Sequence, residues 1–230
     1  MARHIGIVAV SPEGAALCYR QIYQHATARA PAGDQPRISL HNIPLPMYIH
    51  AVHNDDWHRV ASYLGESARI LASCGAELCL TPDNAVQHGI HLAEASSPIP
   101  WVKMTELVGR AIEADQRECI GLIGTRTVMT SSTYQTHLGM KGIRVLVPDD
   151  DGIEDLDRII FEELIFGRIR DESRGRMLQI LHDLGERGCE GVILGCSEAP
   201  LMITEQNSPL PLYDAVDLLA RGAVEMALQG

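Results

Sequence analysis

Apolar and polar residues alternate along this chain in two distinct patterns. Short, almost unbroken apolar runs such as "HIGIVAV" (4–10) and "ECIGLIGT" (118–125) are typical of buried strands, because helices cover both faces of such strands. Longer segments with helical spacing of apolar positions lie between these runs, and "DDWHRVASYLGESARILASCG" (55–75) is a clear example. The alternation of short strands with amphipathic helices predicts an α/β fold with parallel sheets flanked by helices.

The same pattern predicts the remaining elements. Strands are expected at 4–10, 37–44, 76–81, 98–104, 118–125, 143–148 and 189–195. Helices are expected at 12–29, 55–75, 83–95, 105–114, 131–139, 153–169, 171–188, 197–203 and 215–228.

The order of elements restarts halfway along the chain. Residues 5–8 match residues 120–123 at an offset of 115, and later an offset of 113 places Asp83 on Cys196. We therefore predict two pseudo-symmetric lobes, the first formed by 1–103 plus 209–230 and the second by 104–208. Ligands of open α/β sheets bind outside the carboxyl ends of the strands, so we expect an active site in the cleft between the lobes.

Composition excludes several classes of partner. A net charge of −11 argues against nucleic acid, because binding to phosphates requires clustered Lys and Arg. No apolar run reaches the roughly 18–20 residues of a membrane helix, so no membrane association is expected. The opening "MARHIGIVAV" passes directly into a strand pattern without a cleavage site, which favours a mature cytoplasmic protein.

The cysteines offer one candidate for chemistry. None of the six forms a CxxC pair or has the Cys/His spacing of a zinc site, so we expect no metal. In a reducing compartment, scattered cysteines are usually small buried apolar residues, and this is our expectation for five of them. Cys196 differs because it directly follows a predicted buried strand and precedes a predicted helix.

Several segments resemble one known family in the order expected. "GVILGCSEAPLMI" is similar to the Gly-Cys-Thr-Glu signature of the aspartate/glutamate racemases, which work without pyridoxal phosphate. Further segments that resemble the family are "IGIVAVSPEGAALCYRQI", "GLIGTRTVMTSSTY", "RIIFEELIFGRI" and "PLYDAVDLLARGAV", so that the resemblance covers essentially the whole chain. It implies an isomerase that needs no cofactor, takes a small amino acid or carboxylic acid as substrate and forms a homodimer.

The first catalytic motif of the family is altered in this sequence. The family has Cys-Asn-Thr followed by a small residue and His, whereas this chain has Asp83, Asn84, Ala85, Val86 and Gln87. The resemblance implies racemisation by two acid/base groups on opposite faces of the α-carbon. In this chain the two groups would be Cys196 and Asp83.

Asp83 and Cys196 form an unequal pair on chemical grounds. A carboxylate has an unperturbed pKa of ~3.9 against ~8.5 for a thiol, so Asp83 is the weaker base unless burial raises its pKa. A helix N-terminus lowers a thiol pKa, and Glu198 could accept a hydrogen bond from Cys196 or relay its proton. An alternative of equal weight is that Asp83 only caps the following helix, and both roles can coexist.

A substrate carboxylate needs hydrogen-bond donors. Backbone N–H groups after Asp83 and Cys196 could supply them, and side chains at the strand ends could add more. Each of these side chains also has a structural alternative, as a helix cap or a turn residue. The candidate substrate-binding residues are Ser11, Asn84, Ala85, Thr125 and Ser197.

An ionised Asp83 would also repel an acidic substrate. At ~4 Å from a substrate carboxylate the repulsion amounts to ~4 kcal/mol at an effective dielectric near 20. Three possibilities follow. Asp83 is protonated when the substrate binds, Asp83 pairs with the substrate ammonium group, or the substrate is not an acidic amino acid.

Two other functions stay open. A single-cysteine decarboxylase or isomerase of the same superfamily would need only Cys196 to protonate an enolate, and the loss of the first cysteine favours this class. A non-catalytic homologue that binds a ligand is the other alternative, although the retained run from Cys196 to Glu198 argues against it.

Overall fold

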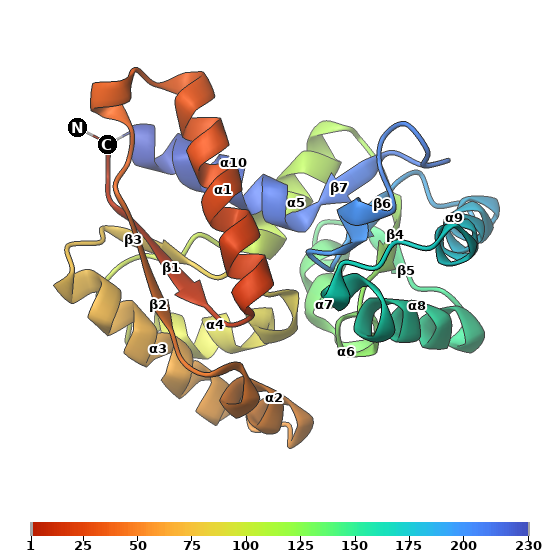
Figure 1. The fold of residues 1–230 in the computed structure, drawn as a ribbon, viewed down its shortest axis with the longest axis horizontal. Coiled ribbons are helices and arrows are strands. Elements are labelled where there is room, and N and C mark those ends of the chain that lie inside the picture. The colour runs from red at the N-terminus through yellow and green to blue at the C-terminus, as the bar shows by residue number, and fades with distance from the viewer. Residues whose placement is uncertain (1, 230) are drawn as a thin grey trace. The chain divides into compact units, whose positions relative to one another are not determined.

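The computed structural model describes residues 2–229, which form two compact units (Figure 1). The first unit contains the chain up to Leu107 and again from Val216, and the second contains Val108–Ala215. The sequence placed these boundaries at 103/104 and 208/209. The boundaries in the structure lie later in the chain, because the chain passes from one unit to the other within two continuous helices, α5 (Met104–Ala114) and α10 (Ala215–Leu228).

The first unit is built on a three-stranded parallel sheet of order β2-β1-β3. Its strands are β1 (Ile5–Ala9), β2 (Ile38–Asn42) and β3 (Leu78–Leu80). Helix α1 (Pro12–Arg29) packs on β1, and α3 (Trp57–Ser73) packs on β1 and β2 from the other face (Figure 1).

The second unit has a four-stranded parallel sheet of order β5-β4-β6-β7. Its strands are β4 (Cys119–Ile123), β5 (Arg144–Leu146), β6 (Val192–Leu194) and β7 (Leu212–Asp214). The remaining helices of both units are α2 (Leu45–His53), α4 (Gln87–Glu94), α6 (Arg126–Thr130), α7 (Thr133–Gly139), α8 (Asp150–Glu162) and α9 (Asp171–Glu186). Short 3₁₀ turns are η1 (Ala32–Asp34), η2 (Asn84–Val86), η3 (Leu164–Phe166) and η4 (Ala199–Leu201).

The internal repeat is visible in the register of the two sheets. The sequence offsets map Ile7 onto Leu122 and Leu80 onto Ile193. Ile7 pairs with Leu80 in the first sheet, and Leu122 pairs with Ile193 in the second. The predicted α/β fold with two related parallel sheets is therefore confirmed.

Several predicted elements differ from the structure. The expected strand at 98–104 contributes only one bridged residue, Trp101 opposite Cys79, since Pro98 and Pro100 have no N–H to donate to a ladder. Residues 45–53, where no helix or strand was predicted, form α2. Residues 212–214, expected in the first lobe, pair with β6 as β7. The helix expected at 197–203 is only the single turn η4.

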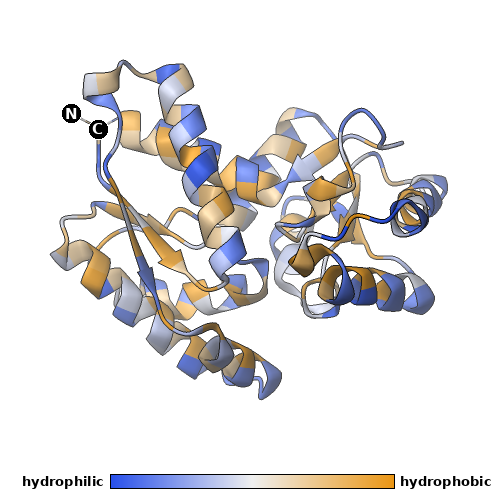
Figure 2. Ribbon diagram, viewed as in Figure 1, coloured by the Kyte–Doolittle hydropathy of each residue, from blue (hydrophilic) through white to orange (hydrophobic). Residues whose placement is uncertain are grey.

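Apolar residues of β1, β3, β4 and β6 lie in the cores of the two units, whereas β2 contributes no buried residue and is largely blue in Figure 2. All five residues of β1 and of β4 are buried. Five of the six cysteines are buried, while Cys74 is exposed, so the prediction of burial is wrong for Cys74. Cys74 caps the end of α3, where the chain leaves the core.

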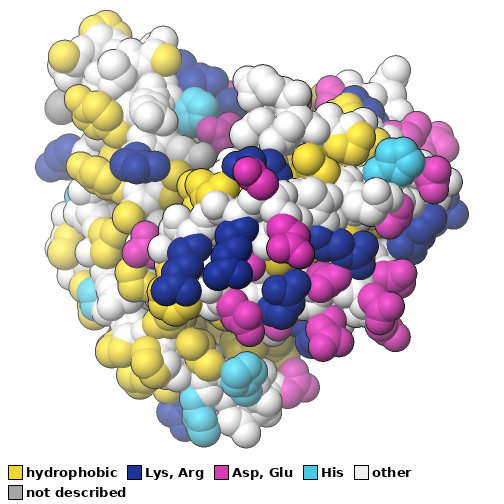
Figure 3. Space-filling model, turned by 45° about the vertical axis from the view of Figure 1, so that its right-hand side comes forward, with side chains coloured by type: hydrophobic (Ala, Val, Ile, Leu, Met, Phe, Trp, Pro, Cys, Tyr) yellow, Lys and Arg dark blue, Asp and Glu magenta, His cyan; other side chains and the backbone are white. Residues whose placement is uncertain are grey.

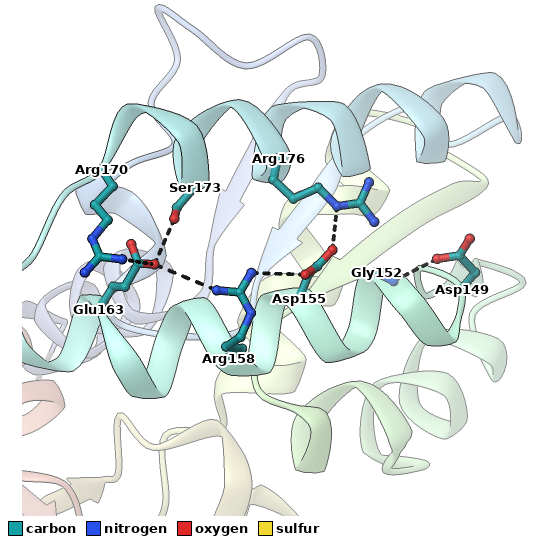
Figure 4. A network of polar contacts seen from close by, with 8 residues as sticks. All are labelled: Asp149, Gly152, Asp155, Arg158, Glu163, Arg170, Ser173 and Arg176. Atoms are coloured by element: carbon teal, nitrogen blue, oxygen red, sulfur yellow. Dashed lines mark hydrogen bonds and ion pairs between the residues drawn. The ribbon is translucent and has the colours of Figure 1, made fainter.

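A polar network links the two long helices of the second unit (Figure 4). The carboxylate of Glu163, only 2% exposed, accepts a hydrogen bond of 2.9 Å from the Ser173 hydroxyl and lies 3.5 Å from the Arg170 guanidinium. Arg176 of α9 donates to Asp155 of α8 over 2.7 Å and holds the pKa of that carboxyl below its usual value. These contacts fix α9, which leads into β6, against α8.

Charged side chains of both signs are interleaved on the face shown in Figure 3. Pairs such as Arg158–Asp155 at 3.1 Å and Arg174–Asp171 are formed within single helices. Between residues 2 and 229, the chain contains no helix that is both long and apolar enough to span a membrane.

Candidate functional site

Cys196 lies just beyond the carboxyl end of β6, and two glycines determine its position. The Gly195 N–H donates to the Ile123 carbonyl over 2.8 Å, which joins the ends of β6 and β4. A Cβ atom on Gly195 would lie 2.9 Å from the Ile123 oxygen, and one on Gly124 would lie 3.0 Å from the Gly195 oxygen. Only glycine permits this approach, which brings Cys196 and Thr125 to the same edge of the sheet.

The Cys196 thiol and the Ser197 hydroxyl are both hydrogen-bonded to the Glu198 carboxylate. The Cys196 sulfur is the donor to Glu198 Oε2 at 2.8 Å, and the Ser197 hydroxyl donates to the same oxygen at 2.8 Å. Burial, followed by the Glu198 carboxylate, raises the pKa of Cys196 well above its usual value. The group is therefore a thiol at neutral pH and is suited to donate a proton.

The expectation that a helix N-terminus lowers the pKa of Cys196 is wrong for this structure. The turn that follows, η4, has three residues, too few for a substantial helix dipole. The backbone N–H groups of Glu198 and Ala199 do favour the thiolate, but burial and the Glu198 charge outweigh them. Burial, with the Glu198 carboxylate as the second cause, therefore decides the resting protonation state of Cys196.

Asp83 occupies the loop after β3 and is half-buried. Its Oδ1 accepts a hydrogen bond of 3.0 Å from the Ala85 N–H, which makes Asp83 the cap of η2. The capping role considered from the sequence is thus present in the structure. The same bond occupies the Ala85 N–H, which the sequence predicts as a donor to a substrate carboxylate.

Gln87 anchors the loop that carries Asp83. This side chain is buried, and its Nε2 donates to the Thr81 and Asp83 carbonyl oxygens, both over 3.0 Å. The neighbouring His88 is exposed and stacks edge-on against Trp57, with ring centroids 4.8 Å apart. Gln87, which stands at the family's histidine position, therefore holds the Asp83 loop in place.

Sequence reasoning missed Tyr48, which lies on α2 and is buried. Burial raises the pKa of Tyr48, and the charge of Asp83 adds to the increase, so the phenol lies within electrostatic reach of that carboxylate. The signal available in the sequence was the Pro44–Leu45–Pro46 run, because proline at the first helical positions is typical of a helix start.

The other predicted substrate residues are half-buried and lie at or near strand ends. Ser11 Oγ accepts from the Gly14 N–H at 3.2 Å, and Thr125 Oγ1 accepts from the Val128 N–H at 3.4 Å, so both are helix caps. Asn84 is the first residue of η2. Within the second unit the structure brings Thr125 to the same sheet edge as the Cys196–Glu198 group.

One group of side chains in residues 2–229 has the composition and spacing of a metal site. It consists of His182, Asp183 and Glu186 on α9, whose ligand atoms lie within 4.8 Å of one another. The group is exposed and lies outside the predicted site residues, so it adds nothing to the chemistry of Cys196.

Comparisons with known proteins agree with this architecture. The sequence profile described as Asp/Glu/Hydantoin racemase matches residues 7–223. A crystal structure from Yersinia pestis, described provisionally as an Asp/Glu racemase, is 30% identical, covers 99% of this chain and 100% of its own, and has a TM-score of 0.92. An aspartate racemase homologue from Pyrococcus horikoshii is 28% identical over 98% and 99% of the two chains, with a TM-score of 0.87.

The same fold also occurs in a protein of different activity. A point mutant of arylmalonate decarboxylase covers 99% of this chain and 94% of its own at 13% identity, with a TM-score of 0.62. At this identity the similarity concerns the fold alone.

Proposed function

Because the chain belongs to the Asp/Glu/hydantoin racemase family, we propose that it is a cofactor-independent racemase of aspartate, glutamate or a related amino acid. The observation that carries the proposal is the buried Cys196 thiol, hydrogen-bonded to Glu198 at the carboxyl end of β6. A thiol in this position is the acid/base group that racemisation at an α-carbon needs on one face.

In the proposed mechanism Cys196 serves one face of the substrate. As a thiol it delivers its proton to the planar carbanion, and the N–H groups of Glu198 and Ala199 then stabilise the thiolate. In the opposite direction the thiol first passes its proton to Glu198 Oε2, 2.8 Å away, and the thiolate then removes the α-proton. Glu198 thus exchanges a proton with Cys196 and can restore either its thiol or its thiolate form.

Asp83 is the proposed acid/base group for the other face. Its carboxylate is a weaker base than a thiolate, so the step at Asp83 is expected to limit the rate. The same carboxylate can pair with the substrate ammonium group, which reduces the repulsion expected for an acidic substrate. We propose that Ser11, Asn84, Thr125 and Ser197, with nearby backbone N–H groups, hold the substrate carboxylate.

A second candidate function is a decarboxylase or isomerase with a single catalytic cysteine. Two observations favour it: Asp83 Oδ1 is occupied by the Ala85 N–H, and the raised pKa of Cys196 suits a group that only donates a proton. In this case Asp83 would act as a cap without a chemical role. A protein that only binds its ligand would show neither reaction.

The first test is proton NMR in D₂O with the L and D forms of aspartate and of glutamate. We expect the wild-type protein to exchange the α-proton and to form the opposite enantiomer, detected by chiral chromatography. Cys196→Ala should abolish both, whereas Cys18→Ala, which removes a buried thiol from α1, should leave both unchanged.

The outcomes separate the candidates. Exchange without inversion would mean that Asp83 does not complete the step on its face. Absence of exchange with all four compounds would contradict the acidic amino-acid racemase, and release of CO₂ from malonate-type acids would then favour the decarboxylase. The homodimer implied by the resemblance stays a prediction that sedimentation velocity can measure.

A further inference from the structure

A pair of thiols lies at the amino end of the second sheet, the edge opposite Cys196. Cys119 is the first residue of β4, and Cys189 precedes β6. The Glu190 N–H donates to the Cys119 carbonyl over 2.8 Å, so the segment before β6 that carries Cys189 runs beside the start of β4. A disulfide requires this kind of close approach between two backbone segments.

The two side chains belong to the same apolar cluster of buried residues. Cys119 is 7% exposed and Cys189 is 5% exposed, and Cys119 is close enough to influence the pKa of Cys189. Burial, followed by the proximity of Cys119, raises the pKa of Cys189. Cys189 is therefore a thiol at neutral pH and suits the second, resolving position of a redox pair.

Cys119 has the surroundings of the reactive partner. Arg144 Nη2 donates to its sulfur over 3.4 Å, so a positive charge lies beside the atom that an oxidant must reach. Cys119 also lines a surface hollow of about 410 Å³, together with Glu118, Gly142, Arg144, Gly188 and Glu190. A small oxidant can therefore approach the sulfur from solvent although the side chain is largely buried.

Two acidic residues, Glu118 and Glu190, line the same hollow as Cys119 and Arg144. The Glu190 carboxylate already accepts the N–H groups of Glu118 at 2.7 Å and of Cys119 at 3.2 Å. Arg187 adds a second positive charge facing Cys189. The pair thus combines two neighbouring thiols, a guanidinium that donates to one sulfur, and a surface hollow lined by Cys119.

We propose that Cys119 and Cys189 form a peroxide-sensitive modification site that closes to a reversible disulfide. The Cys119 thiolate attacks one oxygen of hydrogen peroxide, the O–O bond breaks, and a sulfenic acid and hydroxide form. Cys189 loses its proton and attacks the Cys119 sulfur, the S–O bond breaks and water leaves. Two thiols lose two electrons in total, and one peroxide becomes two waters.

The disulfide would link the amino ends of β4 and β6, whose carboxyl ends carry Thr125 and Cys196. The proposal does not depend on the proposed racemase activity, because it concerns different residues and is measured without substrate.

The test is oxidation of the folded full-length protein with hydrogen peroxide, followed by alkylation and peptide mapping by mass spectrometry. We expect a Cys119–Cys189 cross-link that dithiothreitol reverses, while Cys18 and Cys79 stay reduced. Cys189→Ser should leave Cys119 as a sulfenic acid that dimedone traps.

A surface variant tests the reactive cysteine without disturbing the core. Arg144→Gln should slow cross-linking several-fold, because Cys119 loses its cationic neighbour. Lys141→Gln, which removes an exposed cation paired with Glu113, should leave the rate unchanged. Recovery of both cysteines in reduced form, or equal rates in the wild type and Arg144→Gln, would overturn the proposal.

Discussion

The loops that carry Asp83 and Cys196 occupy equivalent places in the two units but are stabilised differently. In the second unit, backbone contact holds the loop, since Gly195 donates directly to the Ile123 carbonyl. In the first unit, Pro82 stands at the position equivalent to Gly195 and has no N–H to donate. There the Gln87 side chain donates to the carbonyl groups on either side of Pro82.

The two acid/base candidates differ in the same way. The Asp83 carboxylate accepts a bond from the backbone of its own loop, whereas the Cys196 thiol donates to another ionisable side chain, Glu198. A repeat can therefore preserve the position of a functional group while its protonation chemistry changes. The variants below test how far this difference extends.

The largest effect is expected from Asp83→Asn. Asparagine can still cap η2, but it cannot take a proton, so racemisation should fall roughly 10²–10⁴-fold while the fold is retained. Chiral chromatography measures the rate. Asp56→Asn is the matched control, because Asp56 caps α3 through the Arg59 N–H and lies in no proposed site. Wild-type activity in Asp83→Asn would reduce Asp83 to a structural cap.

Gly195→Ala tests the backbone contact of the second unit. The added Cβ would lie 2.9 Å from the Ile123 oxygen, so the backbone must shift to accommodate it. We expect this shift to lower the free energy of unfolding by about 1–3 kcal/mol. Denaturant titration measures the change. Gly175→Ala, at an exposed position of α9 with open space around it, should instead stabilise by about 0.5–1 kcal/mol. Equal stability of the two variants would refute the role of the close approach.

Gln87→Ala tests the side-chain anchor of the first unit. The Thr81 and Asp83 carbonyl groups would lose their donor, at a cost of about 1–2 kcal/mol in unfolding free energy. Thermal unfolding can compare this variant with Gln24→Ala, which truncates an exposed glutamine of α1. If both variants unfold like the wild type, the loop does not depend on Gln87.

The smallest effect is expected from Glu198→Gln, which changes the pH response of Cys196. The Glu198 carboxylate adds to burial in raising the pKa of this thiol, so its removal should lower that pKa. Because the thiolate forms above the pKa, alkylation of Cys196 should begin at lower pH in the variant. Mass spectrometry across a pH series measures the shift, with the exposed Glu205→Gln as control. A shift to higher pH would contradict the assigned cause.

Much of the architecture could be predicted from local patterns. Apolar runs and helical spacing depend on residues that are close in sequence, so they can be recognised without the structure. The repeat is confirmed by strand pairing: Ile7 pairs with Leu80, and the residues at the equivalent positions, Leu122 and Ile193, pair with each other. The predictions were wrong at two places. Prolines prevent the expected strand around Trp101 from forming, and β7 forms only because it pairs with the distant strand β6.

The sequence by itself determined most of the strands and helices, the repeat, and the placement of Cys196 directly after a buried strand. Only the tertiary structure decided that burial and Glu198 keep Cys196 protonated, that Gln87 anchors the Asp83 loop, and that Cys119 meets Cys189. The reason is physical: periodicity is a local property, whereas desolvation and charge–charge contacts depend on groups that folding brings together from distant parts of the chain.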